Sequence, residues 1–127
     1  ALDFIQRNNA NSNESWVVGF SFGALISMQL LMRRPEIFRF ISISPQPNIF
    51  DFNFLAPCPT SGLVIHGDQD QLVPKDTMIV LKEKLVSQKN ITVDFNEIKG
   101  ANHFFTGKEK DLVDCIDGYI KKESRLF

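Results

Sequence analysis

The sequence predicts an α/β protein, a three-layer sandwich built on a mainly parallel sheet of about four strands. Two observations lead to this fold class. Short apolar, β-branched segments alternate with longer segments of helical period, in the order strand, helix, strand, loop, strand, helix, strand, helix. Right-handed crossovers between such strands make them parallel and place helices on both faces of the sheet. We expect residues 1–127 to form a single domain.

The first residues have the pattern of a helix end. Residues 1–9 carry Leu2 and Ile5 on one side, which indicates an amphipathic helix that runs into the polar residues 8–15. Residues 16–20 then form a short β-branched and aromatic run that is too apolar to have one face in water. We therefore expect a buried parallel strand there.

Composition and proline define the next helix, strand and loop. Residues 22–33 are good helix formers and are apolar on nearly every face, which is typical of a buried helix, and Pro35 ends it. Residues 38–44 alternate as a second strand. Residues 46–60 contain three of the six prolines and have no helical period, so we expect a long loop. It either covers the core or forms a wall of an acyl or aromatic substrate pocket.

The second half of the chain continues the same alternation. Residues 62–67 and 91–98 are expected to be the third and fourth strands, with a helix between them at residues 76–87. Its inner side is expected to carry Met78, Leu81, Leu85 and Val86. A last helix, from about residue 108 to 122, has a stripe formed by Leu112, Ile116, Tyr119 and Ile120.

Composition and charge exclude several classes of partner. The formal net charge is -1, and lysine and arginine form no stripe that would neutralise a phosphate backbone, so nucleic acid is not expected. The apolar runs fall short of the roughly 20 residues that cross a bilayer, so no membrane span is expected. Cys58 and Cys115 lack the spacing of a metal or redox motif, so we expect both to be buried side chains and expect no metal or cofactor. Two unpaired cysteines also indicate a cytoplasmic protein.

The most informative motif is Gly-x-Ser-x-Gly at residues 19–23, between an expected strand and an expected helix. A turn this tight strains its central residue and needs small residues two positions away, as Gly19 and Gly23 are. Ser21 is then a candidate nucleophile near the helix N-terminus, where the N–H of Phe22 donates to an oxyanion. Taken alone, the motif also fits a small-residue turn that only packs helix against strand.

A serine nucleophile needs a base and an acid. His66 lies in an apolar strand and is expected to be a core or strand-end residue, whereas His103 follows the fourth strand, at the sheet edge where loops meet. Two carboxylates follow the third strand. Asp68 is placed to close the turn through local hydrogen bonds, and Asp70 lies further out. Turn chemistry favours Asp70 as the acid and leaves Asp68 open.

Three ordered segments resemble the signature of the α/β-hydrolase superfamily: Gly-Phe-Ser-Phe-Gly at 19–23, His-Gly-Asp-Gln-Asp with Val-Pro at 66–74, and Gly-Ala-Asn-His-Phe-Phe at 100–105. More narrowly, the chain resembles the small, lid-poor hydrolases near dienelactone hydrolase, whose Gly-x-x-Asp-x-x-Val-Pro segment places the acid at Asp70. The resemblance implies a partial α/β-hydrolase fold and an esterase-like serine hydrolase with Ser21, Asp70 and His103 as its triad. It would cleave a small ester or related acyl compound through an acyl-enzyme. Dienelactone hydrolase itself has a cysteine nucleophile, so its lactone chemistry is not implied.

The N-terminus differs from the pattern of this superfamily. The chain opens at Ala1, and no segment resembles the earlier strands or the loop that donates the second oxyanion N–H. We expect a fragment that lacks N-terminal strands, with the strand at 16–20 as an apolar edge through which copies of the chain pair. The alternative function is an impaired fragment or a non-enzymatic binding module that retains the fold.

Overall fold

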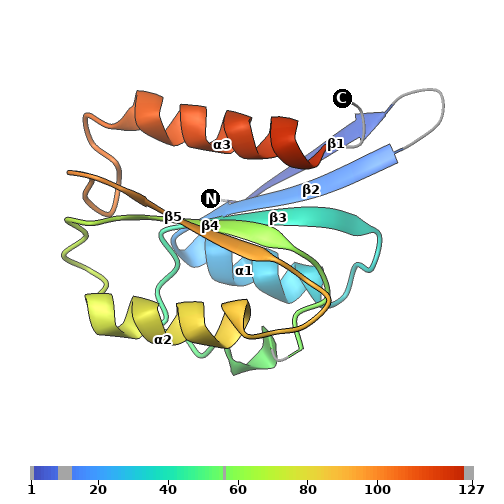
Figure 1. Cartoon of the computed structure of the whole chain (residues 1–127), viewed down its shortest axis with the longest axis horizontal. Helices are drawn as coiled ribbons and strands as arrows, with labels where there is room; N and C mark the ends of the chain where they lie inside the picture. The colour runs from blue at the N-terminus through green and yellow to red at the C-terminus, as the bar shows by residue number, and fades with distance from the viewer. Residues whose placement is uncertain (1, 9–12, 56, 125–127) are drawn as a thin grey trace.

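The computed structural model describes residues 2–8, 13–55 and 57–124. In these residues, five strands form one sheet in the order β1-β2-β3-β4-β5 (Figure 1). The elements in chain order are β1 (Leu2–Asn8), β2 (Asn13–Phe20), α1 (Phe22–Leu31), β3 (Ile37–Ile43), a short 3₁₀ helix (Asn53–Leu55), β4 (Gly62–Gly67), α2 (Lys75–Val86), β5 (Val93–Ile98) and α3 (Glu109–Glu123).

The sheet has the parallel arrangement that the sequence predicts. Strands β2 to β5 are parallel to one another, with Val18 opposite Ile41 and Val64 opposite Phe95. Helices α1 and α2 lie on one face of the sheet, and α3 lies on the other (Figure 1). The three-layer α/β class is therefore confirmed, and the carboxyl ends of the four parallel strands meet at one edge of the sheet.

The N-terminal segment differs from its prediction. Residues 2–8, expected to be the end of a helix, form strand β1, which pairs antiparallel with β2 so that Leu2 is opposite Gly19 and Asn8 is opposite Asn13. This pairing satisfies backbone N–H and C=O groups that an open edge of β2 would leave unpaired. The prediction of an open edge at residues 16–20 is therefore wrong, and self-association through that strand loses its structural basis.

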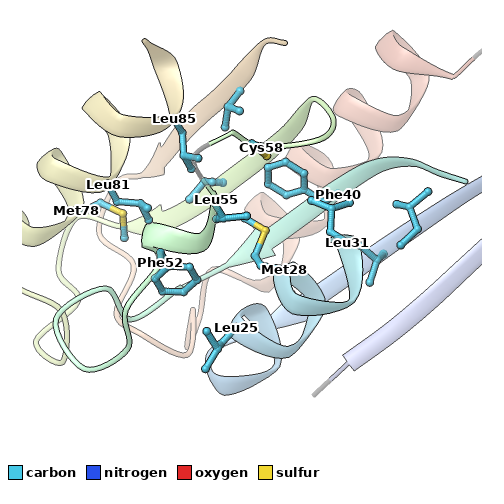
Figure 2. Packing of buried hydrophobic residues seen from close by; sticks show 14 of the residues in the cluster. Leu25, Met28, Leu31, Phe40, Phe52, Leu55, Cys58, Met78, Leu81 and Leu85 are labelled. Atoms are coloured by element: carbon cyan, nitrogen blue, oxygen red, sulfur yellow. The ribbon is translucent and has the colours of Figure 1, made fainter. Parts of the chain in front are cut away.

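The sheet divides the core into two clusters. The first lies between the sheet and helices α1 and α2, and includes Met28, Phe40 and Leu85 (Figure 2). The second lies under α3 around Trp16, whose ring contacts that of Tyr119 edge-on at 5.9 Å between centroids. Both faces of β2 to β4 are thus buried, as expected for parallel strands.

Two helices bury less of their surface than predicted. Helix α1 leaves Gln29 exposed although its neighbours Met28 and Leu31 are buried, so it has one solvent-facing side. In α2, Met78, Leu81 and Leu85 face the core, but Val86 is 52% exposed. None of the helices in the described ranges combines the length and apolarity needed to cross a bilayer.

The loop between β3 and β4 covers the core with its second half. Phe52, Leu55 and Cys58 are buried in the cluster under α1 and α2. The Gln88 side chain, just beyond α2, donates to the Leu55 carbonyl at 2.7 Å and accepts from the Cys58 N–H at 2.6 Å. The core-cover interpretation therefore holds for this part of the loop, while Phe50 at its beginning stays half-buried.

We expect Leu55→Ala to lower the free energy of unfolding by about 2–5 kcal/mol, because Leu55 is fully buried and its loss leaves a cavity. Urea unfolding followed by circular dichroism measures this change. Ile49→Ala is the control in the same loop, where the side chain is 60% exposed, and is expected to change the energy by less than about 0.5 kcal/mol. Equal small effects of both variants would show that the loop does not close the core.

Candidate active site

Ser21 occupies the tight turn between β2 and α1. Its backbone has φ 57° and ψ −115°, a conformation that non-glycine residues rarely adopt. The Ser21 N–H donates to the Ile43 carbonyl of β3 at 2.8 Å, and the Ser21 carbonyl accepts from Ala24 N–H at 3.0 Å. The neighbouring strand and the first turn of the helix thus hold the strained residue in place, and strain held in this way is a feature of functional sites.

The turn has room only for glycine at position 19. A Cβ atom placed on Gly19 would lie 2.2 Å from the carbonyl oxygen of Gly23 and 2.7 Å from the Ser27 hydroxyl. The first of these contacts is with backbone, so no side-chain rotation relieves it. The close approach of strand and helix is therefore the physical reason for the glycine.

The three predicted residues meet at the carboxyl edge of the sheet. Ser21 Oγ lies 2.9 Å from His103 Nε2, and His103 Nδ1 lies 2.7 Å from Asp70 Oδ2. The side chains of His103 and Asp70 are each only 3% exposed, and a low local dielectric strengthens hydrogen bonds such as these. Since the Asp70 carboxylate accepts, Nδ1 carries the imidazole proton and Nε2 is free to accept the proton of Ser21.

The structure distinguishes the two candidate acids. Asp70 Oδ2 accepts from His103, while Oδ1 accepts from the backbone N–H groups of Leu72 at 2.8 Å and Val73 at 3.2 Å. Asp68 instead accepts from the Gly100 N–H at 2.6 Å and closes the contact between the loops after β4 and β5. Asp70, and not Asp68, is therefore the carboxylate that orients the imidazole.

Ser44 is a residue of the site that sequence reasoning missed. It directly follows β3, is fully buried and has φ 51°. Its hydroxyl donates to the backbone carbonyl of His103 at 2.8 Å, and its N–H donates to the Ile65 carbonyl at 2.8 Å. Ser44 thus fixes the backbone from which the imidazole projects. A serine that continues an alternating strand pattern gives no signal of this role.

Aromatic residues lie next to Ser21 in sequence and next to His103 in space. Phe22 is 55% exposed, and its ring lies 5.5 Å from the Phe50 ring, measured between centroids. Phe104 is 61% exposed, and its ring lies 5.1 Å from the His103 ring. The N–H of Phe22 is the first of α1, so it has no partner within the helix and is available to an anion at the positive end of the helix dipole.

The remaining histidine and the cysteines lie outside this group. His66 Nδ1 is 3.9 Å from the Glu97 carboxylate on the neighbouring strand, and burial lowers the pKa of His66 against the raising effect of Glu97. Burial raises the pKa of both thiols, Cys58 and Cys115, and both are free. Within the described part of the chain, no cluster of three or more His, Cys, Asp or Glu side chains is arranged to hold a metal.

The sequence matches the family model of the dienelactone hydrolase family over residues 1–125. An uncharacterized protein of Rickettsia prowazekii (strain Madrid E) is 45% identical over an alignment of 124 residues, and the match covers 94% of this chain and 52% of that protein. The similarity to this family, first indicated by three short motifs, therefore extends over nearly the whole sequence.

Solved structures show the same fold. A protein of unknown function from Agrobacterium tumefaciens, classed with the α/β-hydrolases, is 54% identical with a TM-score of 0.82, over 84% of this chain and 49% of that one. An α/β serine hydrolase without lid from Xanthomonas campestris is 31% identical with a TM-score of 0.71, over 84% of this chain and 46% of that one. The chain thus spans about half the length of these relatives.

Proposed function

The chain belongs to the dienelactone hydrolase family, and we propose that it is the part of a serine hydrolase that cleaves a small ester or related acyl compound. The observation that carries the proposal is the hydrogen-bonded series from Ser21 through His103 to Asp70, with distances of 2.9 and 2.7 Å. A hydroxyl, an imidazole and a buried carboxylate in this geometry are the components of nucleophilic acyl transfer.

In the first half of the proposed reaction, Ser21 Oγ bonds to the ester carbonyl carbon while its proton passes to His103 Nε2. Asp70 stabilises the imidazolium that results. The tetrahedral intermediate then expels the alcohol: its carbon–oxygen bond breaks, and the proton on Nε2 passes to the leaving oxygen. The acyl group remains on Ser21 as an ester.

In the second half, a water molecule gives a proton to His103 Nε2 as its oxygen attacks the acyl carbon. The bond from that carbon to Ser21 Oγ breaks, the proton on Nε2 returns to Oγ, and the carboxylic acid leaves. In both halves negative charge forms on the former carbonyl oxygen, and the Phe22 N–H at the start of α1 is the donor we assign to it. One such donor is worth about a hundred- to a thousand-fold in kcat.

The rings near Ser21 favour a substrate with an apolar part. The ring of Phe22, the residue after Ser21, contacts the Phe50 ring, and the Phe104 ring contacts that of His103. Exposed apolar surface beside a nucleophile is the usual form of a binding site for an acyl or aryl group. A cytoplasmic location is part of the proposal because both cysteines are unpaired.

A fluorophosphonate probe tests the proposed function. We expect it to add to Ser21 and to no other residue, as mapped by mass spectrometry, both in this chain and in any longer protein that contains it. Ser21→Ala is the control and is expected to abolish the adduct. A longer protein that binds the probe nowhere, while remaining folded, would contradict the hydrolase and favour a binding module.

A further inference from the structure

Gln46 lies beside the reacting hydroxyl although no sequence motif indicates it. Its side-chain oxygen Oε1 is 3.4 Å from Ser21 Oγ, and the residue is half-buried. In the described residues, no other hydrogen bond of this amide is found. The group therefore faces the nucleophile without being committed elsewhere.

The backbone before Gln46 is held by the same contacts that hold the base. Ser44 has φ 51° and donates both to the His103 carbonyl and to the Ile65 carbonyl, each at 2.8 Å. Two residues later the chain reaches Gln46. The strained turn thus sets the position of the imidazole loop and that of the Gln46 loop together.

The backbone around Gln46 is constrained by its sequence and by turn hydrogen bonds. Pro45 and Pro47 flank the residue, and each proline fixes its own φ. The Gln46 carbonyl accepts from the N–H groups of Ile49 at 3.1 Å and Phe50 at 3.0 Å, which closes a turn. Because the backbone of Gln46 is already held, only the rotamer freedom of its side chain is lost when the amide contacts Ser21.

Counting protons assigns the direction of the contact. Ser21 has one O–H, and His103 Nε2 is the closer acceptor at 2.9 Å, with Nδ1–H occupied by Asp70. Once Ser21 donates to His103, its oxygen can only accept from Gln46. The amide must then present its N–H₂ group, which a half-turn of the terminal amide brings to the same place as its oxygen.

We propose that Gln46 is a positioning residue for the nucleophile, whose amide N–H donates to Ser21 Oγ and holds the Ser21 O–H on His103. This inference rests on the proposed serine hydrolase function. The hydrogen bond also favours the oxygen as its proton leaves, because the negative charge that develops strengthens an N–H donor.

The test compares rates of fluorophosphonate addition to Ser21 across pH. Gln46→Met keeps the length of the side chain without the donor, and we expect addition roughly 3- to 10-fold slower at every pH. Gln46→Glu places a carboxylate that only accepts, so addition is expected to be slower and its pH midpoint higher, because the new charge stabilises the imidazolium of His103. In the described residues, Asp70 is the only charged partner of His103 at ion-pair distance.

Asn48→Ala is the matched control in the same loop. Asn48 donates to the Leu72 carbonyl at 3.0 Å and does not contact Ser21, so addition is expected at the wild-type rate. Thermal unfolding of each variant separates positioning from misfolding. Three results would each overturn the role of Gln46 and leave the proposed hydrolase function intact: a wild-type rate in Gln46→Met, an unchanged pH midpoint in Gln46→Glu, or an equal loss of rate in Asn48→Ala. If the probe does not add to the wild-type protein, the role of Gln46 and the hydrolase function are both overturned.

Discussion

Asp70→Asn is expected to lower kcat/KM for an activated ester such as p-nitrophenyl acetate by about ten-thousand-fold. Asn presents an N–H₂ group to His103 Nδ1 where the carboxylate now accepts at 2.7 Å. The imidazole then changes tautomer, and Nε2 carries a proton and no longer accepts the one on Ser21. Initial rates of ester hydrolysis measure the loss, with whichever protein, this chain or a longer one, reacts with the fluorophosphonate at Ser21.

The fold is expected to survive this substitution. The other oxygen of Asp70 accepts from the N–H groups of Leu72 and Val73, and an amide oxygen takes over both bonds. Asp68→Asn is the matched control, because its oxygen continues to accept from Gly100 N–H and never meets the imidazole. We expect kcat/KM near the wild-type value for Asp68→Asn. An equal loss in both variants would show that the acid is assigned wrongly.

The sequence predicts those elements of the fold whose conformation depends on neighbouring residues in the chain. Residues 62–67 form β4 with the predicted bounds, because a short apolar run that lies between two glycines and contains only His66 as a polar residue has few alternatives to a buried strand. Residues 2–8 were mispredicted because their pattern suits a helix, whereas pairing with the edge of β2 decides their conformation. Strand formation depends on a partner, and no local pattern contains the partner.

The site was predictable in part for a related reason. Ser21 and His103 are indicated by a turn motif and by a loop position, which are local features. Asp68 and Asp70 are two residues apart on one loop, and only their hydrogen-bond partners in the structure distinguish the acid of the site from the other carboxylate. Ser44 and Gln46 were missed because their importance arises from the place where β3 ends, next to the turn that follows β2.

The turn that holds Ser21 is expected to fail when Gly19 gains a side chain. A Cβ atom there would lie 2.2 Å from the Gly23 carbonyl oxygen, so the strand and the helix must separate by an appreciable fraction of an ångström. We expect Gly19→Ala to lower the free energy of unfolding by about 3 kcal/mol. Fluorophosphonate addition to Ser21 is expected to be at least about a hundred-fold slower, because a displacement of this size misaligns Ser21 with His103.

Gly118→Ala is the matched glycine control for this prediction. Gly118 lies within α3, and nothing is within 4 Å of a Cβ atom placed on it. Alanine there restricts the unfolded chain and suits a helix, so we expect about 0.5–1 kcal/mol of stabilisation and unchanged addition to Ser21. Urea unfolding is expected to show a lower free energy of unfolding for Gly19→Ala and a higher one for Gly118→Ala. Probe kinetics on both variants measure the rate of addition to Ser21. If Gly19→Ala unfolds and reacts like the wild-type protein, the close approach of β2 and α1 does not position the nucleophile.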